Sequence, residues 1–370
     1  MKIGIPKEIK PDEYRVGATP HTVHSLVLAG HKVEVETQAG EKIGYTDEMY
    51  AKEGAKIVGS ARDIYRNEMI IKVKEPQASE FPLMSENQIL FCYLHLAADP
   101  EQTKHLLEMK VVGIAYETVT DENGRLPLLI PMSEIAGRVA IQAGATALQI
   151  IHGGRGVLLG GIPGVRPGKV TVLGAGVVGT EAMRMGLGLG ADVTIIDKNL
   201  TRLRELDKLY APALQTVFAT PAVIREAVIH ADLVIGAVLI PGAKAPKLVT
   251  KEMVKNMRPG SVIVDVAIDQ GGSCETSRPT THSAPTYLVD GVVHYCVTNM
   301  PAACARTATK GLTNATYPYA LKLANLGYKK ALLGDLGFLS GLNLYRGKVT
   351  NAGVAEALGY DFVTPEKAIH

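Results

Sequence analysis

The sequence of 370 residues has no large excess of charge of either sign, and this weighs against two broad classes of function. Lys and Arg together number 39 and Asp and Glu number 37, so the formal net charge is only +2. Proteins that bind nucleic acid or anionic membranes through their overall charge carry a clear positive excess. We therefore expect no nucleic-acid partner, and we expect small molecules and further copies of the chain instead.

Long hydrophobic runs are also missing. The most apolar segments, ILFCYLHLAA and ADLVIGAVLIPGA, are too short or too interrupted by His, Asp, Pro and Gly to span a bilayer, which takes about 20 apolar residues. The opening MKIGIPKEIK lacks the apolar core and cleavage site of a signal peptide. These features predict a cytoplasmic protein that does not bind membranes.

Cysteine is scarce. The four cysteines, Cys92, Cys274, Cys296 and Cys304, have irregular spacings, no CxxC pair and no histidine at metal-ligand spacing. We interpret them as reduced and structural, and we predict no metal site.

What the sequence does contain is hydrophobic material for two cores. The length and the 46% of hydrophobic residues favour two domains. Early in the chain, short apolar runs alternate with amphipathic stretches, as in an α/β domain. Beyond Pro167, six apolar strands alternate with helices, a pattern typical of a parallel sheet covered on both faces.

Two helical segments divide the chain. One follows Met132, and the other follows Pro301 and suggests a return to the first domain. We therefore predict a two-domain α/β fold. A Rossmann-type, doubly wound parallel sheet, residues 129–304, is inserted into a discontinuous flavodoxin-like α/β substrate domain, residues 1–128 plus 305–370.

A dinucleotide fingerprint lies in the predicted inserted domain. Gly174, Gly176 and Gly179 form a GxGxxG between the apolar strand KVTVL and a helix, and the next strand ends in Asp197. A carboxylate there can accept hydrogen bonds from the adenosine ribose, and it would repel the 2'-phosphate of NADP. NAD is therefore the predicted cofactor, although Arg202 is a residue type that can accommodate a 2'-phosphate.

Five further residues are candidates for chemistry, each with a plainer interpretation beside it. Asp269 ends the apolar run SVIVDVAI and is expected to face the nicotinamide, but it could equally cap a loop. His95, in an apolar run, is either a proton-transfer group or a hydrogen-bonded core histidine. Lys72 and Lys74 share a strand face by period 2 and would ordinarily be solvated. Arg15 alone looks like an ordinary loop arginine.

A series of motifs carries a resemblance over nearly the whole chain. KEIKPDEYRVGATP, IIKVKEP, YLHLAAD, GIAYETV, PLLIPMSEIAGR, GGRGVLLGGIPGV, IGAVLIPGAKAPKLV, VIVDVAIDQGG, RPTTH and NMPAA occur in order. In these motifs the sequence resembles the family of alanine dehydrogenases and the NAD-binding component of nicotinamide nucleotide transhydrogenases.

The resemblance assigns roles to individual residues. It implies that Arg15 and Lys74 bind the substrate carboxylate, that His95 is the acid-base and that Asp269 is a second catalytic residue. Around NAD it implies, besides the three glycines, Ser133, Val178, Asp197, Arg202, Thr220, Leu239, Ile268, Arg278, Asn299 and Met300.

The resemblance also implies an activity and an assembly. The expected reaction is NAD-dependent oxidative deamination of L-alanine to pyruvate and ammonium, together with its reverse, in a homo-hexamer built largely through the dinucleotide domains. Two alternatives are a transhydrogenase component that passes hydride to a partner protein and a NAD-binding regulatory module. The joint occurrence of Arg15, Lys74 and His95 argues against the regulatory module.

Overall fold

Two α/β units make up the computed structural model, which describes residues 1–238 and 245–370. One unit consists of Met1–Met132 and Ala305–His370, and the other is Ser133–Cys304. The predicted α/β architecture, one domain inserted into a discontinuous other, is confirmed. The predicted first boundary, after residue 128, lies just before helix α5 (Ile130–Ala147), which runs across the boundary that the structure shows.

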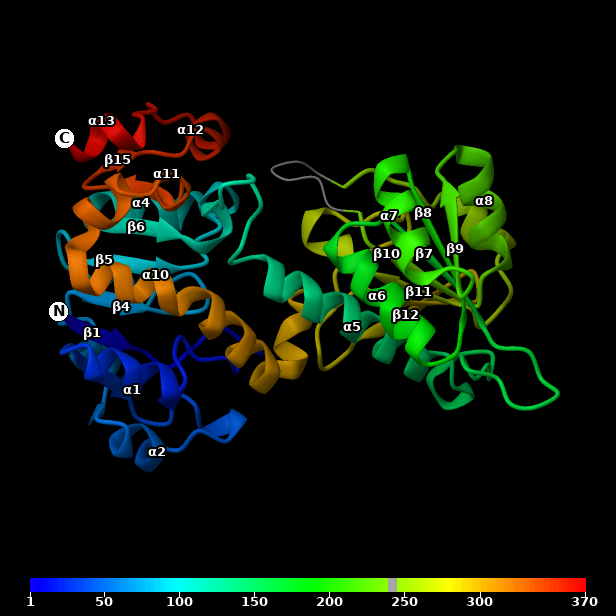
Figure 1. Cartoon of the computed structure of the whole chain (residues 1–370), viewed down its shortest axis with the longest axis horizontal. Coiled ribbons are helices and arrows are strands. Elements are labelled where there is room, and N and C mark those ends of the chain that lie inside the picture. Colours follow the sequence, from blue (N-terminus) through cyan, green and yellow to red (C-terminus); the bar gives the residue numbers. More distant parts are fainter. Residues whose placement is uncertain (239–244) are drawn as a thin grey trace. The chain divides into compact units, whose positions relative to one another are not determined.

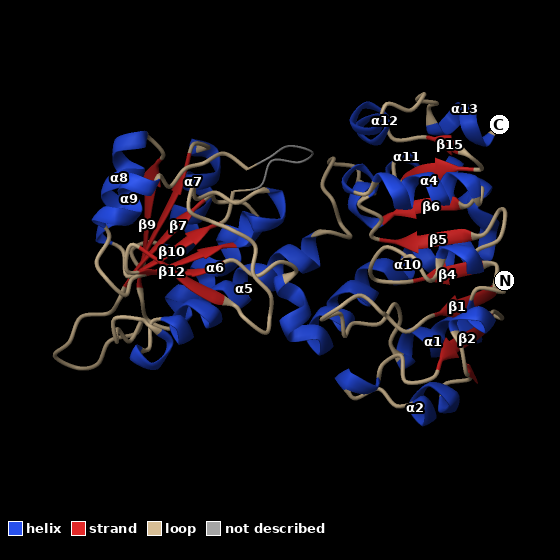
Figure 2. Ribbon diagram, turned by 180° about the vertical axis from the view of Figure 1, so that it is seen from behind, coloured by secondary structure: helices blue, strands red, loops and turns tan. Residues whose placement is uncertain are grey.

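The first unit is built on an eight-stranded sheet with the order β15-β14-β6-β5-β4-β1-β2-β3 (Figure 2). Strands β1 to β6 are all parallel, and β14 and β15 extend the sheet antiparallel at one edge. The strands are β1 (Lys2–Ile5), β2 (Lys32–Glu36), β3 (Lys56–Val58), β4 (Met69–Ile71), β5 (Ile89–Cys92), β6 (Val112–Ala115), β14 (Leu342–Tyr345) and β15 (Lys348–Val349).

The strand order of this sheet differs in one respect from the flavodoxin-like expectation. Strand β1 lies between β2 and β4, with β3 outside β2, so the parallel part has the order 3-2-1-4-5-6. A flavodoxin sheet has the order 2-1-3-4-5. Both orders reverse direction beside the first strand, and here that switch point lies between β1 and β4.

Eight helices accompany this sheet in the described part of the first unit, the longest of them α10. They are α1 (Pro20–Leu28), α2 (Asp47–Lys52), α3 (Ala61–Ile64), α4 (Pro100–Glu108), α10 (Ala305–Leu333), α11 (Leu336–Leu339), α12 (Ala352–Leu358) and α13 (Pro365–Ile369). Helix α10, orange in Figure 1, contacts α1 and is kinked at Gly327, where φ is +72°.

The second unit contains all six predicted strands in a seven-stranded sheet with the order β12-β13-β11-β10-β7-β8-β9. Its elements are β7 (Lys169–Leu173), α6 (Val177–Gly188), β8 (Asp192–Asp197), α7 (Leu200–Tyr210), β9 (Leu214–Phe218), α8 (Pro221–His230), β10 (Leu233–Gly236), α9 (Lys251–Asn256), β11 (Val262–Asp265), β12 (Thr286–Val289) and β13 (Val292–Tyr295). Only β12, which was not predicted, is antiparallel to its neighbour.

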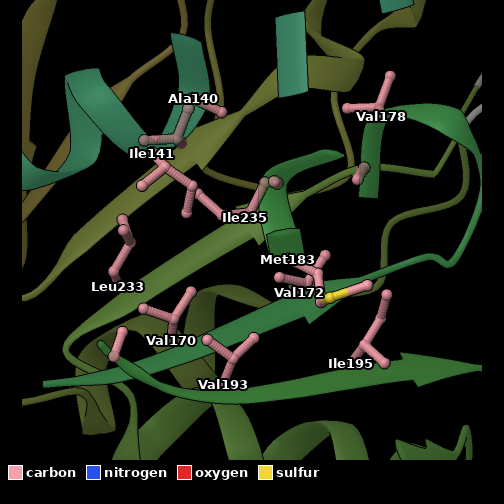
Figure 3. Close-up of a cluster of buried hydrophobic side chains, with 14 of the residues drawn as sticks. Ala140, Ile141, Val170, Val172, Val178, Met183, Val193, Ile195, Leu233 and Ile235 are labelled. Carbon is pink, nitrogen blue, oxygen red and sulfur yellow. The ribbon is translucent and has the colours of Figure 1, made fainter. Parts of the chain in front are cut away.

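Hydrophobic residues pack on both faces of this second sheet. On one face, side chains of β7, β8 and β10 meet Ala140 and Ile141 of α5 and Met183 of α6 (Figure 3). On the other face, alternate residues of the same strands, among them Leu173 and Val234, pack with residues of α8 and α9. The burial of both faces explains why these strands lack polar alternation.

None of the helices within residues 1–238 and 245–370 combines the length and the hydropathy required to cross a bilayer.

Candidate active site

Charged side chains gather where the central strands of the first sheet end. The carboxyl ends of β4, β5 and β6 lead into residues 72–75, 93–95 and 116–117, and the loop after β1 carries residues 8–15. In doubly wound sheets, ligands bind outside these ends, beside the switch point. Three of the predicted residues, Arg15, Lys74 and His95, come from these segments.

Arg15 is almost completely buried and held in place by Glu13. Nε donates to Oε1 of Glu13 at 2.7 Å, and Nη2 donates to Oε2 at 2.6 Å. Nη1 donates to Sδ of Met132 at 3.0 Å. Burial acts against the charge, but the hydrogen bond and charge of Glu13 outweigh it and raise the pKa of Arg15. The interpretation of Arg15 as an ordinary loop residue is therefore wrong, because 1% exposure is not that of a solvated side chain.

Lys74 lies in the electrostatic field of Arg15. Burial lowers the pKa of Lys74, and the positive charges of Arg15 and Lys10 lower it further, while Glu75 and Glu13 oppose them. Two cations held this close together attract an anionic group. The arrangement suits the recognition of a carboxylate.

His95 is joined to Glu75 and, through it, to Lys10. Nδ1 of His95 lies 3.3 Å from Oε2 of Glu75, and the ammonium of Lys10 binds the other oxygen. Burial raises the pKa of Glu75, but the hydrogen bonds with His95 and Lys10 prevail and lower it to about 2. Glu75 is therefore an anion at neutral pH that orients the imidazole.

The interpretation of His95 as a core histidine is wrong. Its side chain is 45% exposed, and its ring stacks on that of Tyr93 with centroids 5.9 Å apart. The residue has a left-handed backbone, φ +48° and ψ +37°, immediately before a short 3-10 helix, Leu96–Ala98. The backbone N–H of His95 donates to Oε1 of Glu117 at 2.6 Å and so holds this uncommon conformation.

The expectation that Lys72 and Lys74 are both solvated is wrong for Lys72. It is fully buried, with Nζ 2.8 Å from Oε1 of Glu80 and 3.4 Å from Oε2 of Glu8. Burial opposes its charge, but both carboxylates overcome burial and raise the pKa of Lys72. The period-2 rule placed Lys72 and Lys74 on one face, but strand β4 ends at Ile71, before either lysine.

In the second unit, the three glycines meet the steric demands of the fingerprint. Gly174 has φ +103°, and a Cβ there would lie 2.8 Å from the carbonyl oxygen of Ala237. A Cβ at Gly179 would lie 1.8 Å from the carbonyl oxygen of Gly174, so α6 can approach the turn only without one. A Cβ at Gly176 would meet no protein atom within 4 Å, so the fold itself does not require glycine there. Close approach of a ligand would require it.

Asp197 and Arg202 both bind the backbone of this glycine turn. Asp197 ends β8, and its Oδ2 accepts from the N–H of Ala175 at 2.6 Å. Nε of Arg202 donates to the carbonyl of Ala175 at 3.1 Å, and Nη2 donates to Thr180 at 3.0 Å. Because a carboxylate has about four lone-pair positions, Asp197 can accept further hydrogen bonds from a ribose.

Asp269 does not end a strand, and this part of the prediction is wrong. Strand β11 ends at Asp265, and Asp269 is an exposed residue of the following 3-10 helix, Val266–Gln270. The buried Asp265 accepts hydrogen bonds from Ser273, Cys274 and Ser277, and so ties down the loop that follows. The segment VIVDVAID did not reveal that its first aspartate is structural and its second exposed.

The other predicted cofactor residues belong to the second unit. Ser133 lies on α5, Val178 is in the first turn of α6 and Thr220 caps α8. Ile268 and Met300 are buried, Arg278 lies over the ring of Tyr287, and Asn299 has a left-handed backbone, φ +57°. Leu239 lies outside the described residues. Their contacts with a cofactor stay predictions.

The glycine turn and the start of α6 fit a dinucleotide. Helix α6 has 12 residues, and its N-cap, Gly176, supplies no side-chain hydrogen bond to the first turn. Its first amide groups and partial positive charge suit a pyrophosphate, and Asp197 lies at the end of the neighbouring strand. The residues present therefore fit a nicotinamide dinucleotide.

Several residues at these sites had not been predicted. Glu13, Glu75 and Glu117 each hold a predicted residue. Glu13 lies two residues before Arg15, which it holds, and Glu75 follows Lys74 directly but holds His95. An acidic residue beside each basic candidate was the available signal, in the motifs DEYR and KVKEP.

Comparison with protein families covers most of the chain. A model described as alanine dehydrogenase/PNT, N-terminal domain, matches residues 4–136. A model described as alanine dehydrogenase/PNT, C-terminal domain, matches residues 140–352.

Individual proteins are similar over their full length. An alanine dehydrogenase of Halomonas elongata is 55% identical over 98% of both chains, and one of Methanococcus maripaludis is 55% identical over 100% of both. Among solved structures, an L-alanine dehydrogenase superposes with a TM-score of 0.95 at 53% identity, covering 97% of this chain and 99% of that chain. A transhydrogenase from Sinorhizobium meliloti reaches 0.84 at 25% identity, covering 94% and 100%.

Proposed function

Because the chain belongs to the alanine dehydrogenase/PNT family, we propose that it deaminates L-alanine oxidatively to pyruvate and ammonia and catalyses the reverse reductive amination. The observation that carries this proposal is the set of Arg15, Lys74 and His95 at the carboxyl ends of the first sheet. Two buried or half-buried cations and one exposed imidazole are what an α-amino acid and its oxo acid require.

In this proposal Arg15 and Lys74 hold the substrate carboxylate. The Glu13 pair fixes the guanidinium plane, which favours a directed, planar contact with a carboxylate. The ammonium of Lys74 also stabilises negative charge that develops on the carbonyl oxygen during amination.

The glycine turn and Asp197 would hold NAD, which would supply the acceptor for the hydride from Cα of alanine and, as NADH, the hydride donor for amination. The imine that results must be hydrolysed by water. We assign to His95 the removal of a proton from that water and its return to nitrogen as the carbinolamine releases ammonia. Because Glu75 engages Nδ1, we assign these transfers to Nε2 of His95.

NAD is proposed over NADP because of Asp197. Its carboxylate lies at the end of β8, against the turn that binds the dinucleotide in this proposal. The guanidinium of Arg202 is engaged by Ala175, Thr180 and Glu205, so it is already committed within the protein. This supports the prediction of NAD over NADP, which the presence of an arginine at position 202 had weakened.

The decisive assay is consumption of NADH by the purified chain. We expect oxidation with pyruvate and ammonium together, and none with pyruvate alone, because reduction requires the imine. Parallel reactions with glyoxylate and 2-oxobutyrate define the substrate range. Absence of ammonium-dependent turnover would contradict the proposal.

The 25% identity with a transhydrogenase keeps that activity as the competing candidate. A transhydrogenase component passes hydride between nucleotides and needs neither pyruvate nor ammonium. Hydride exchange between NADH and an oxidised dinucleotide analogue, with no reaction of pyruvate, would favour it.

We also propose that the protein is a cytoplasmic homo-hexamer. A reducing compartment agrees with the four cysteines, which are all free and of which three are buried. Support for self-association comes from large exposed hydrophobic side chains in the second unit.

A further inference from the structure

Three buried ionisable side chains lie close to Lys74, and the mechanism above does not use them. Glu8, Lys72 and Glu80 are only 7%, 0% and 1% exposed. The ammonium of Lys72 lies 2.8 Å from Glu80 and 3.4 Å from Glu8. Two carboxylates thus share one cation. Burial of the second negative charge costs free energy unless a proton neutralises it.

The two carboxylates have different neighbours. Oε1 of Glu8 accepts from the backbone N–H of Val73 at 2.7 Å and from that of Lys74 at 3.4 Å. Glu80 instead accepts from the hydroxyl of Tyr65 at 2.9 Å and from the N–H of Gln77 at 2.7 Å. Glu8 therefore holds the backbone that carries Lys74, and Glu80 holds the chain further on.

We infer that Glu8 is a positioning residue for substrate binding, because its ionised carboxylate fixes the Val73 and Lys74 backbone and thereby the direction in which Lys74 presents its ammonium. The inference rests on the proposed role of Lys74. The carboxylate accepts from these N–H groups on one oxygen and faces the ammonium of Lys72 with the other. A protonated Glu8 would have to place an O–H group in one of these positions.

Burial makes the Glu8 carboxyl harder to ionise than that of an ordinary glutamate. Burial raises its pKa, Lys72 lowers it, Glu13 and Glu80 raise it, and the N–H of Val73 lowers it, with a result of about 7. Further groups that interact electrostatically with Glu8 are Arg15, Tyr65, Cys92 and Tyr116. Substrate affinity should therefore improve as pH rises and Glu8 ionises.

The test uses the full chain with NADH bound and oxamate, an unreactive isostere of pyruvate, as the probe. Glu8→Gln imitates the protonated acid. At about pH 8 we expect oxamate to bind about tenfold more weakly to Glu8→Gln than to the wild type, and at about pH 5.5 we expect equal affinities. A purely structural defect would give a ratio that does not change with pH, and that result, or equal affinity at both pH values, would overturn the inference.

A second variant keeps the test decisive if Glu8→Gln does not fold. Glu80→Gln leaves Lys72 paired with Glu8 and removes a negative charge that raises the pKa of Glu8, so the pH at which oxamate affinity changes should move downward. It is also the matched control: it removes one carboxylate from Lys72, but it should retain wild-type oxamate affinity at about pH 8. An unmoved transition in Glu80→Gln would overturn the inference.

Lys74→Ala separates this inference from the proposed function. If Lys74→Ala binds oxamate normally, Lys74 is not a substrate group and the proposed role fails. If Lys74→Ala loses oxamate while Glu8→Gln retains it at both pH values, only the positioning role of Glu8 fails. NADH binding, measured by fluorescence, should be unchanged in all these variants because their substitutions lie outside the dinucleotide unit.

Discussion

The exposed imidazole of His95 has two restraints that a solvated histidine would lack. Glu75 engages Nδ1, and Glu117 binds the backbone N–H. Together they fix the tautomer and the ring position at the end of β5, so a single ring nitrogen can serve both directions of the reaction.

His95→Ala should therefore lower turnover by about 10² to 10⁴, the usual effect of removing a general acid-base. In the wild type, deamination should become faster with rising pH, because it needs a free amine and a neutral base, and amination should have a lower optimum. Steady-state and single-turnover rates between about pH 6 and pH 10 test this. His24→Ala is the control, since His24 is also exposed and paired with a glutamate, Glu53. An unchanged pH profile in His95→Ala would move the assignment to Asp269.

Lys74→Ala should abolish turnover and leave NADH binding intact, because the residues that fit the dinucleotide belong to the other unit. Lys72 is unsuitable as a control, because it is buried in an ion-pair cluster and its removal should destabilise the protein. Lys104→Ala is the better control, since that side chain is 68% exposed. Near-normal rates in Lys74→Ala would show that this lysine has no part in substrate binding.

At individual positions, the sequence predicted which residues lie at the site better than it predicted whether their side chains are buried or exposed. Arg15, Lys74 and His95 do lie together, but the sequence alone could not show that Lys72 is buried or that His95 is exposed. Burial depends on where a strand ends and on what packs against it. The same limit explains Asp265 and Asp269, since which aspartate ends β11 is decided by tertiary hydrogen bonds to residues 273–277.

At the scale of elements, the turn between β7 and α6 decides which coenzyme binds. Asp197 should disfavour the 2'-phosphate of NADP by repulsion of about 4 kcal/mol at close range and intermediate dielectric. We expect catalytic efficiency with NAD to exceed that with NADP by at least about tenfold. Equal efficiencies would contradict this interpretation.

Two variants of Asp197 separate its charge from its hold on the turn. Asp197→Asn keeps an acceptor for the N–H of Ala175 and removes the charge, but it loses the acceptor for the N–H of Asn199. It should therefore narrow the difference in catalytic efficiency between the coenzymes at a modest cost in stability. Asp197→Ala should also narrow the difference in catalytic efficiency, but it removes the hydrogen bonds that hold the glycine turn and should weaken the binding of both coenzymes. Kinetics with each coenzyme distinguish the two effects.

Three segments of the first unit are tied together by Glu75: the loop after β1 through Lys10, the end of β4, and the end of β5 through His95. The pKa of Glu75 is depressed to about 2, below the ordinary 4.5, so its ionised form stabilises the folded state. This contribution is present above about pH 4.5 and is lost as pH falls toward 2.

Glu75→Gln should therefore cost about 3 kcal/mol of stability at neutral pH. The thermal unfolding midpoint of the variant should lie below that of the wild type at about pH 7, and the difference should shrink toward about pH 3. Glu108→Gln, an exposed glutamate of α4, is the control with no expected shift. A difference that stays constant with pH would show that the carboxylate is not the stabilising form.

Most strands of the second unit could be predicted from the sequence. All six predicted strands of the second unit are present, because buried parallel strands are continuous apolar runs. Strand β12, TYLV, was missed because it is a short, half-exposed edge strand. The position of β1 in the first sheet depends on pairings between segments far apart in sequence, so a flavodoxin-like order could not be told from the observed one.

At the scale of the whole molecule, the second unit has an exposed apolar segment that packing within a single chain does not explain. Between residues 150 and 165, five large hydrophobic side chains are more than half exposed: Ile150 (76%), Ile151 (83%), Leu158 (66%), Ile162 (59%) and Val165 (60%). Such concentrations of exposed apolar surface mark sites of association. The segment belongs to the dinucleotide unit, through which the hexamer is predicted to form.

We expect the wild-type protein to sediment as a species with six times the 39.4 kDa mass of one chain. A double variant, Ile151→Glu with Leu158→Glu, should dissociate into smaller species. Burying unpaired charges in an apolar interface costs more free energy than the burial of apolar surface there contributes. NADH binding per chain should persist, since neither residue is among those predicted to bind the coenzyme. Leu336→Glu, a side chain of the first unit that is 76% exposed, is the matched control and should leave the hexamer intact. Analytical ultracentrifugation measures all three, and a double variant that remains hexameric would place the interface elsewhere on the chain.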